Sequence, residues 1–571
     1  MKRLNEENHK MNRRLLLFLT FLCTTGTGFA QNIPLGFPIL NDYLRREQVM
    51  DNLNSNFSFN YKPILVEKAF PAFTNSFLLD TVNGFEEKTP RLYSKNKAFK
   101  MALLPLQLNT VYNSSNPYGW GNGAIIPARG LQTLLSAGVS MNWGNLSVQL
   151  YPQFHWAQNL EFEEYPKNAP IQYFQIMKRD EGGTEKPVRF VGKNRTEVLP
   201  GNSHIQYNFG SFATGISTEN ISWGPGQFNS LLLSDNAEGF LHFTLKTTKP
   251  AKTFIGSFEG QYFMGKLDAY GGPYYSDSAY VDILKIKREI SWRYFTGISI
   301  SYNPKWTEGL SIGFSRTFQV YRKDMEDNFK AWFPIFAPLP KEGTGVIENI
   351  KLRQDQHVAV FARWVVKKAN AEFYFEFLRN DHPLNWRDLF LNSEHSSAYI
   401  LGFNKGFKIE HNKYIFVRSE YTHTQAPLNN IVREGGQGVG VYYNGQVKQG
   451  LTQKGQILGA GPGQSGNHLI LEIRKANSFN STGITLERLA RDQNFYTNAK
   501  YANFNLLPWV DLSAGVFAEV VKGNLLVSGN LKTILSKNKN WLPVDNGLDG
   551  LGTKGENSFS IYSNIKIAYI L

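Results

Sequence analysis

The feature that most constrains this fold is an alternation of residue types on both sides of Asn303-Pro304. Apolar and amphipathic side chains occupy every second position from Trp292 to Tyr302 and return at Leu310, Ile312, Phe314 and Phe318, with small or polar residues between them. A period of two indicates strands with one apolar face, and runs of about ten residues match tilted strands that cross a bilayer. We therefore predict a membrane-spanning hairpin. The residues expected to face lipid are Trp292, Ile298, Ile300, Leu310, Ile312 and Phe314, and those expected to face inward are Arg293, Ser299 and Ser311.

The same alternation recurs from Ala371 to Phe377, over 512–535, and in the last strand, over 559–571. No segment beyond the first 30 residues supplies the roughly 18 uncharged apolar residues of a transmembrane helix. A closed barrel satisfies every backbone polar group while half of its side chains stay polar, in keeping with a mean hydropathy of −0.34. We predict an all-β fold, a transmembrane antiparallel β-barrel over residues 98–571. A large soluble sandwich or propeller is the alternative.

The N-terminus has the three parts of a secretory signal peptide. Arg13 and Arg14 precede an apolar run from Leu15 to Leu22, and the small residues Gly28 and Ala30 stand three and one before a cut. We expect a signal peptide over residues 1–30 and a mature chain that begins at Gln31. Translation could also start inside this leader, at the second methionine.

Cys23 is the only cysteine, and it lies inside the expected leader. Phe21 and Leu22 are larger than the residues that precede a lipidated cysteine, so we expect no lipid anchor there. The mature chain would then have no disulfide, no thiolate metal site and no cysteine nucleophile.

Residues 31–97 lack the alternation and are predicted to form a separate N-terminal helical or irregular portion. Residues 38–54 are expected to include a short helix at the periplasmic side or within the barrel mouth, because their apolar residues share one stripe. That stripe consists of Leu40, Tyr43, Leu44 and Val49. Long polar or Gly-rich intervals at 117–130, 325–349 and 428–466 predict extracellular loops or segments that enter the lumen.

Charge does not indicate a nucleic-acid partner. The net charge of +14 is scattered along the chain and forms no basic helix or groove-fitting patch. A positive surface can attract acidic polysaccharide or lipopolysaccharide phosphate, and positive charges on solvated loops explain the net charge equally well.

Seven charged residues inside alternating runs should point inward, because an Arg at mid-depth on the lipid face costs about 2–4 kcal/mol. They are Arg363, Glu372, Glu376, Arg418, Glu420, Glu472 and Arg474. They indicate either a lumen that binds a solute or an ion-paired core, and the need of buried charges for partners favours the core.

None of the apparent catalytic motifs lies in the structural context that its chemistry requires. The Gly-rich stretch 461–466 matches a phosphate-binding pattern, but no strand–helix unit surrounds it, and Pro462 lacks the backbone donor. Ser203 and His204 are neighbours on a strand and point to opposite faces, so they cannot form a nucleophile–base pair. The histidines show no zinc-binding spacing, and Asp381-His382 is better explained as a loop hydrogen bond. We expect no enzyme activity, metal or cofactor.

Two Gly-rich motifs decide the functional interpretation. A Trp-Gly-Pro-Gly turn at 223–226 leads into a Leu-Ser-Asp-Asn-Ala segment that ends at Ala237, and a Tyr-Gly-Trp-Gly-Asn-Gly-Ala loop spans 118–124. The first motif resembles the capsule assembly protein Wzi family. The second is similar to that family's early Asn/Asp-Gly loop, with Gly121 where a polar residue is usual.

The resemblance implies an outer-membrane barrel of about 18 strands with a small N-terminal helical portion. It also implies a non-catalytic lectin that attaches or assembles capsular polysaccharide at the cell surface. The expected partners are polysaccharide, outer-membrane lipid and lipopolysaccharide, and we expect a monomer. The candidate glycan-binding or motif residues are Trp120, Asn122, Trp223, Gly224, Pro225, Gly226, Ser234 and Asn236. For Trp223, a packing or girdle role competes with direct stacking on sugar.

Three classes of function remain open. The first is a surface polysaccharide-binding protein, and the second is a porin or solute channel, which the inward charges would allow. The third is an outer-membrane hydrolase, for which the sequence offers no matched nucleophile and base. Conductance across a planar bilayer separates the first two, because a plugged lectin barrel should be nearly silent.

Overall fold

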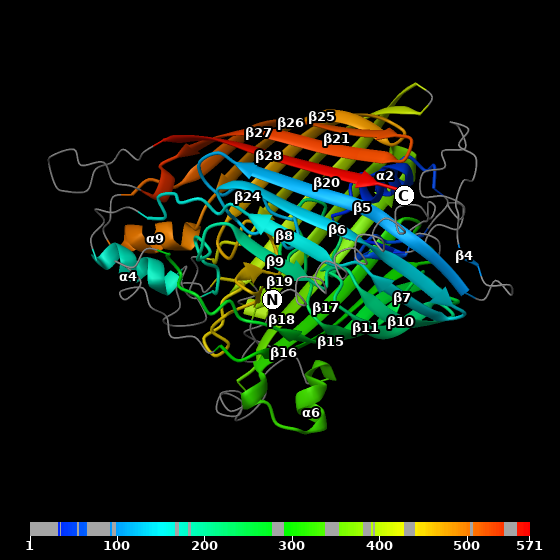
Figure 1. The fold of residues 1–571 in the computed structure, drawn as a ribbon, viewed down its shortest axis with the longest axis horizontal. Coiled ribbons are helices and arrows are strands. Elements are labelled where there is room, and N and C mark those ends of the chain that lie inside the picture. The colour runs from blue at the N-terminus through cyan, green and yellow to red at the C-terminus, as the bar shows by residue number, and fades with distance from the viewer. Residues whose placement is uncertain are drawn as a thin grey trace, which may run out of the picture.

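The computed structural model is a closed antiparallel barrel of 18 strands (Figure 1). It describes residues 32–34, 36–53, 56–65, 92–93, 99–165, 171–180, 184–276, 290–336, 353–380, 390–391, 394–410, 412–427, 440–502, 506–541 and 557–570. The expected signal peptide and mature start lie outside these residues. β28 pairs with β5, from Tyr562 opposite Asn113 to Tyr569 opposite Leu106, and this pairing closes the wall.

Two wall strands are each broken into halves, β7 with β8 and β9 with β10. The wall consists of β5 (Phe99–Asn113), β6 (Gly130–Trp143), β7 (Leu146–Leu150), β8 (Gln153–Ala157), β9 (Arg195–Leu199), β10 (His204–Phe209), β11 (Phe212–Ser217), β13 (His242–Thr247), β15 (Gly256–Leu267), β16 (Arg293–Pro304), β17 (Leu310–Tyr321), β18 (Asp355–Val366), β19 (Ala371–Asn380), β20 (Ser397–Glu410), β21 (Lys413–His423), β24 (Asn467–Asn477), β25 (Asn480–Ala490), β26 (Val510–Lys522), β27 (Leu525–Lys537) and β28 (Ser558–Tyr569).

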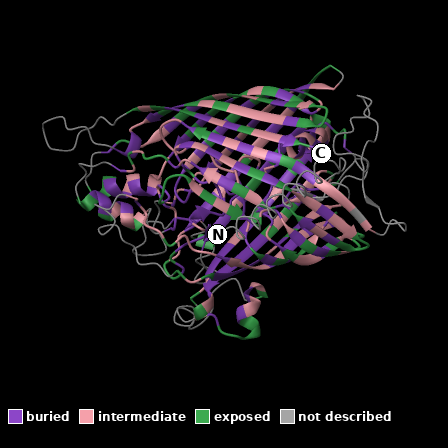
Figure 2. Cartoon of the chain, in the orientation of Figure 1, coloured by how far each residue is buried: buried purple, intermediate pink, exposed green. Residues whose placement is uncertain are grey.

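The predicted hairpin is confirmed as β16 and β17. Ile300 lies opposite Phe314 in the antiparallel register, and both side chains point outward, with 48% and 36% of their surface exposed. Ser299 and Ser311 are buried on the inward face. Figure 2 shows the resulting alternation of buried and exposed residues along the wall strands.

The two ends of the barrel differ in the length of their connections. Short turns at Gly210-Ser211, Ser478-Phe479 and Gly523-Asn524 lie at one end, where the C-terminus is also found (Figure 1). Long loops lie at the opposite end. Because outer-membrane barrels keep their periplasmic turns short, we assign the long-loop end to the extracellular side.

The lumen is filled by a plug built from three parts of the chain. Helix α2 (Leu40–Val49) and the short strands β1 (Asn32–Ile33), β2 (Tyr61–Lys62) and β3 (Ile64–Leu65) form the first part. The other two are the motif loop (residues 222–237), with β12 (Ser222–Trp223), and the return loop (residues 440–466), with β22 (Thr452–Gln453) and β23 (Gln456–Ile457). Pairing of β12 with β2 joins the N-terminal part to the motif loop. The expected helix is therefore present, and it lies inside the barrel near the periplasmic end.

The remaining elements sit at the ends or on the flank of the barrel. α4 (Ile171–Asp180) and α9 (Gln493–Tyr501) cover the extracellular end, and α6 (Phe329–Trp332) stands against the outside of the wall (Figure 1). The other short elements are β4 (Leu92–Tyr93), β14 (Ala251–Lys252), η2 (Arg322–Asp324), η3 (Pro334–Phe336), η4 (Lys367–Ala369) and η5 (Lys539–Trp541). Within the described residues, no helix is both long and apolar enough to span a membrane.

Candidate functional site

Two carboxylates on the barrel wall hold the motif loop. Glu420 of β21 accepts hydrogen bonds from the backbone amides of residues 227–229, at 2.8, 3.1 and 2.8 Å. Glu376 of β19 accepts from the amides of Gly226 and Leu231, at 2.7 and 2.9 Å. Five amides of a buried loop are thus satisfied by two inward carboxyl groups, as buried backbone groups require. The predicted inward direction of these two strand carboxylates is confirmed.

Trp223 is a packing residue of the plug. Its side chain is only 2% exposed, its indole N–H donates to Gln261 at 2.9 Å, and its ring centroid lies 5.2 Å from that of Phe263. The glycines beside it are required by close approach. A Cβ at Gly224, whose φ is +107°, would stand 2.4 Å from the carboxylate of Glu376. The Trp-Gly-Pro-Gly turn therefore lets the backbone reach the wall carboxylates.

The end of the motif loop binds the return loop. The Ser234 hydroxyl donates to the carbonyl of Gly459 at 2.6 Å, and the Asn236 amide donates to that of Ile457 at 3.0 Å. From the return loop, the Tyr442 hydroxyl donates to the carbonyl of Leu231 at 2.7 Å. These bonds make the two loops one packed unit within the extracellular half of the lumen.

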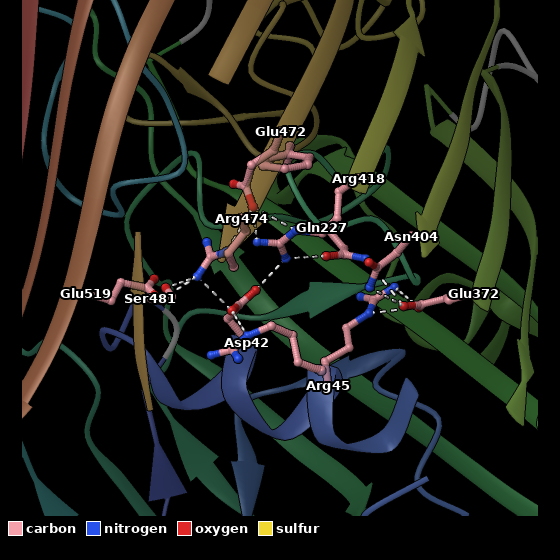
Figure 3. Close-up of polar contacts among 12 residues, drawn as sticks. Asp42, Arg45, Gln227, Glu372, Asn404, Arg418, Glu472, Arg474, Ser481 and Glu519 are labelled. Carbon is pink, nitrogen blue, oxygen red and sulfur yellow. Dashed lines mark hydrogen bonds and ion pairs between the residues drawn. The ribbon is translucent and has the colours of Figure 1, made fainter. Parts of the chain in front are cut away.

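An ionic network fixes helix α2 to the opposite wall (Figure 3). Asp42 pairs with Arg418 of β21 and with Arg474 of β24, and both arginines also contact Glu472. Arg474 continues the network to Glu519 of β26. Burial alone would raise the pKa of Asp42, but the surrounding arginines hold it well below its usual range. The inward charges were open to two interpretations, a solute-binding lumen and an ion-paired core. This network is such an ion-paired core.

A second set of contacts connects α2 to the motif loop. Arg45 donates through Nε to Glu372 at 2.8 Å and through Nη2 to the carbonyl of Pro225 at 2.6 Å. Arg363 donates to the same Glu372 carboxylate at 2.5 Å. Removing Glu372 would leave both buried arginines without their carboxylate partner.

Beside this network lies an inner cavity of about 420 Å³, between the plug and strands β24 to β28. Its lining mixes polar and apolar residues and carries both signs of charge, and it includes Gly226 and Ser234 of the motif loop. Burial raises the pKa of Asp235, which also lines this cavity, to about 6. A cavity with both signs of charge is suited to ordered water or to a small polar solute.

An outer cavity of about 260 Å³ lies at the extracellular end, under α4 and beside α9. Its aromatic lining consists of Tyr118, Trp120, Phe162, Tyr165, Tyr173, Tyr274, Tyr275, Trp509 and Trp541. The rings pack edge to face, with centroid distances of 5.2 Å for Trp509 and Trp541 and 4.9 Å for Tyr165 and Tyr275. Edge-to-face packing fixes the orientation of the rings before any ligand arrives.

Polar groups stand between these rings. Arg491 donates to Asp511 at 2.5 Å and lies 5.0 Å over the Trp509 ring, whose N–H donates to the same carboxylate at 2.9 Å. Lys186 and Asp492 form an ion pair at 3.2 Å, and both remain part-exposed at 21% and 24%. The cavity thus offers the part-exposed rings of Trp120, Phe162, Tyr274 and Trp509 together with charged donors and acceptors. This combination suits a ligand with both apolar patches and hydroxyl groups.

The loop 118–124 separates the two cavities. Trp120 and Asn122 line both of them, as does Asn236. The Trp120 ring stands perpendicular to His468 at 4.8 Å, and the Asn122 side chain accepts a bond from Asn564 of β28 at 2.6 Å. Both residues are therefore held in place and partly open to the cavities.

The structure divides the eight residues selected from sequence. Trp120, Asn122 and Asn236 border the outer cavity, and Gly226 and Ser234 border only the inner one. Within the described part of the chain, Trp223, Gly224 and Pro225 line neither cavity. Sequence reasoning missed the aromatic residues of other loops, above all Trp509 and Trp541. A tryptophan just outside an alternating run was the one available signal for Trp509.

Groups considered for chemistry remain apart. The Ser203 hydroxyl donates to the carbonyl of Pro200 at 2.6 Å, whereas His204 faces Glu219 at 2.9 Å. The Gly-rich stretch 461–466 belongs to the return loop, where Gly461 lies against Trp120. Among the residues that the structure describes, no group of three or more His, Cys, Asp or Glu residues is arranged to hold a metal ion.

Comparisons with known proteins agree with this architecture. Among solved structures, the chain is similar to Wzi of Escherichia coli, an outer-membrane protein involved in group 1 capsule assembly and described as a carbohydrate-binding β-barrel. That match has 12% identity and a TM-score of 0.56, and covers 95% of this chain and all of the other. OprD of Pseudomonas aeruginosa matches with 8% identity and a TM-score of 0.35, over 81% of this chain and 92% of the other. OccD3 from the same organism matches with 9% identity and a TM-score of 0.37, over 82% and 91%.

A search of curated proteins gives no match. A family model described as capsule assembly protein Wzi matches residues 129–488, which is more than half of the chain. The matched region contains the motif loop, most of the wall and the return loop. The chain is an outer-membrane β-barrel that belongs to the capsule assembly protein Wzi family.

Proposed function

We propose that the protein binds capsular polysaccharide at the cell surface and retains it there, without making or cutting it. The observation that carries this proposal is the outer cavity, where nine aromatic side chains and several polar groups converge at the extracellular end. Aromatic rings cover the apolar face of a sugar, while amide, carboxylate and ammonium groups bind its hydroxyls. The solved family member from Escherichia coli, described as carbohydrate-binding, supports the same assignment.

The plug argues against a diffusion channel as the main function. Helix α2, the motif loop and the return loop occupy the lumen and are bound to the wall by the Glu376, Glu420 and Asp42 contacts. A porin needs a continuous aqueous path, whereas these contacts hold the plug within the path. Solute transport would therefore require displacement of several buried charges.

The purified barrel provides the test of this proposal. Calorimetric titration with capsular polysaccharide from the parent strain should give saturable binding, and the polymer should keep its chain length after prolonged incubation. The same preparation should be nearly silent in a planar bilayer. Absence of binding together with steady ion conductance would replace this proposal with the porin. Shortening of the polymer would instead identify a hydrolase.

A further inference from the structure

After β17 the chain forms a flap on the outside of the barrel. We call residues 325–336 the flap; it contains α6 and η3. In Figure 1 it stands beside the wall near β15 and β16 rather than over the extracellular opening. It therefore lies on the flank, next to the face that the wall turns toward lipid.

The flap covers a charge that the alternation of β17 directs toward lipid. Arg316 lies opposite Ile298 in the register, so it shares the outward face with Phe314. It is nevertheless only 4% exposed. Its guanidinium donates to Gln356, another outward residue, at 3.0 Å and to the flap carbonyl of Ile335 at 3.2 Å. The flap thereby shields a cation that bare lipid would disfavour.

The inner side of the flap is firmly packed. The Tyr294 hydroxyl of β16 donates to the carbonyl of Trp332 at 2.7 Å, and the two rings meet edge to face at 5.2 Å. Met325 and Ala331 are buried in a cluster with Tyr294 and Val320. All of these wall positions lie in the extracellular third of β16 and β17, which fixes the height of the flap on the barrel.

The outer side of the flap carries exposed aromatic rings. Phe329 is 68% and Phe336 is 72% exposed, and Phe329 stacks on Phe333 at 4.8 Å. One acidic group of the flap is neutralised, because Asp327 pairs at 2.7 Å with Arg322, which lies just before the flap. Phenylalanine rings on a packed flap would be unfavourable in water. Their position continues a belt of outward aromatic side chains at the extracellular end of the wall. Its members include Phe243, Trp292 and Phe559, which are 39%, 37% and 59% exposed.

We propose that the outer face of the flap is immersed in the outer leaflet of the membrane, with Phe329 and Phe336 at the boundary between acyl chains and headgroups. Three observations carry this: the flank position, the lipid-facing arginine beneath the flap, and the continuity of its rings with the belt. Aromatic side chains concentrate at this boundary in barrels, and the exposed Lys330 between them extends to the headgroup phosphates. The flap anchors the extracellular end of β16–β18 against the leaflet, independently of any polysaccharide.

Site-specific labelling tests this placement, because the one cysteine of the sequence falls in the expected leader. Single variants Phe329→Cys and Phe336→Cys would carry a fluorescent label in vesicles of phosphatidylglycerol and lipopolysaccharide. Nitroxide-bearing lipids should then quench both labels, and aqueous iodide should not. Ile300→Cys on the lipid face provides the quenched control, and Lys193→Cys at an exposed loop provides the aqueous control.

Iodide quenching of both flap labels as strong as at Lys193→Cys would overturn the proposal. Disulfide cross-linking of two chains through these cysteines would also overturn it, since a second copy would then cover the rings. A variant that misfolds is recognised by loss of the heat-dependent gel shift of the folded barrel. For such a case, Phe336→Ser with a label on Lys330→Cys provides a second measurement. Nitroxide-bearing lipids should quench the Lys330→Cys label less in the Phe336→Ser variant than in the protein that keeps Phe336.

Discussion

Glu420 illustrates how one residue can determine the conformation of a loop far away in the sequence. Its carboxylate accepts three consecutive backbone amides of the motif loop and the hydroxyl of Tyr374 at 2.8 Å. A charged acceptor makes stronger bonds than a neutral one. This role was not visible in the sequence, where Glu420 could be placed only as an inward charge.

We expect Glu420→Gln to loosen the motif loop while the wall stays intact. The amide side chain keeps one acceptor and loses the charge, at a cost on the order of 2 kcal/mol. Hydrogen exchange at residues 227–229 should therefore accelerate, by roughly thirtyfold if the loop opens locally. Glu410→Gln, which changes an exposed carboxylate of β20 that pairs only with the nearby Lys413 among the described contacts, is the control. Unchanged exchange at 227–229 would show that the carboxylate does not hold the loop.

The outer cavity gives a second prediction at single residues. Trp120→Ala and Trp509→Ala each remove a part-exposed ring from the cavity. Loss of one stacking face costs about 1–2 kcal/mol, which weakens the polysaccharide Kd by roughly tenfold. Trp306→Ala, at an exposed periplasmic turn, should leave the affinity unchanged. If Trp120→Ala and Trp509→Ala bind the polysaccharide as tightly as Trp306→Ala and wild type, the outer cavity is not the binding site.

Trp223→Ala should instead lower the thermal stability of the plug, because the Trp223 ring packs inside the plug.

Asp42 makes the plug sensitive to acid. Its folded pKa is depressed from the ordinary value of 3.8, so its stabilising contribution is complete above that value and is lost as the pH falls below it. Wild type should be more heat-stable than Asp42→Asn near neutral pH. This difference should shrink between about pH 4 and about pH 2. A difference in melting temperature that stays constant over this range would contradict the assigned network.

At the scale of elements, strand faces can be tested through one hairpin. Ile300 points into lipid near the middle of β16, so Ile300→Arg should cost about 2–4 kcal/mol and impair insertion. Asn530→Arg in β27 points into the inner cavity and is the matched inward substitution. Ser299 is unsuitable as that control, because its hydroxyl contacts Ser315 and Tyr61 of the plug. Heat-modified gel migration reports folding, and similar losses for both arginine variants would refute the assigned faces.

The wall strands could be predicted from sequence because their signal is local. Alternation over ten residues identifies the faces of β16, β17 and β28, and the outward exposure of Phe559 and Ile565 confirms the last strand. Arg316 departs from that rule, since it occupies a lipid-facing position. This arginine is tolerated at a lipid-facing position because the flap covers it. The position of the flap is a tertiary feature that cannot be predicted from the residue pattern of β17.

At the scale of the whole molecule, the sequence predicted the barrel but not the arrangement inside it. The interval 428–466 was expected as an extracellular loop or as a segment that enters the lumen, and no position was predicted for the motif loop. The structure folds both the motif loop and the return loop inward around α2. The outer cavity collects rings from segments as distant as Tyr118 and Trp541. Such convergence depends on closure of the wall between β28 and β5, and spacing along the chain does not encode it. For this reason three of the eight selected residues, Trp223, Gly224 and Pro225, pack in the plug and line neither of the two cavities.

Retention of polymer on living cells tests the central claim most directly. Cell-bound and released capsular polysaccharide would be measured in a deletion strain, in the strain complemented with wild type, and in one complemented with the Trp120→Ala, Trp509→Ala double variant. Deletion should move polymer into the medium while total polymer stays roughly constant, and the double variant should restore retention only in part. If the deletion strain keeps its polymer attached and instead loses uptake of a small solute, the retention account is wrong.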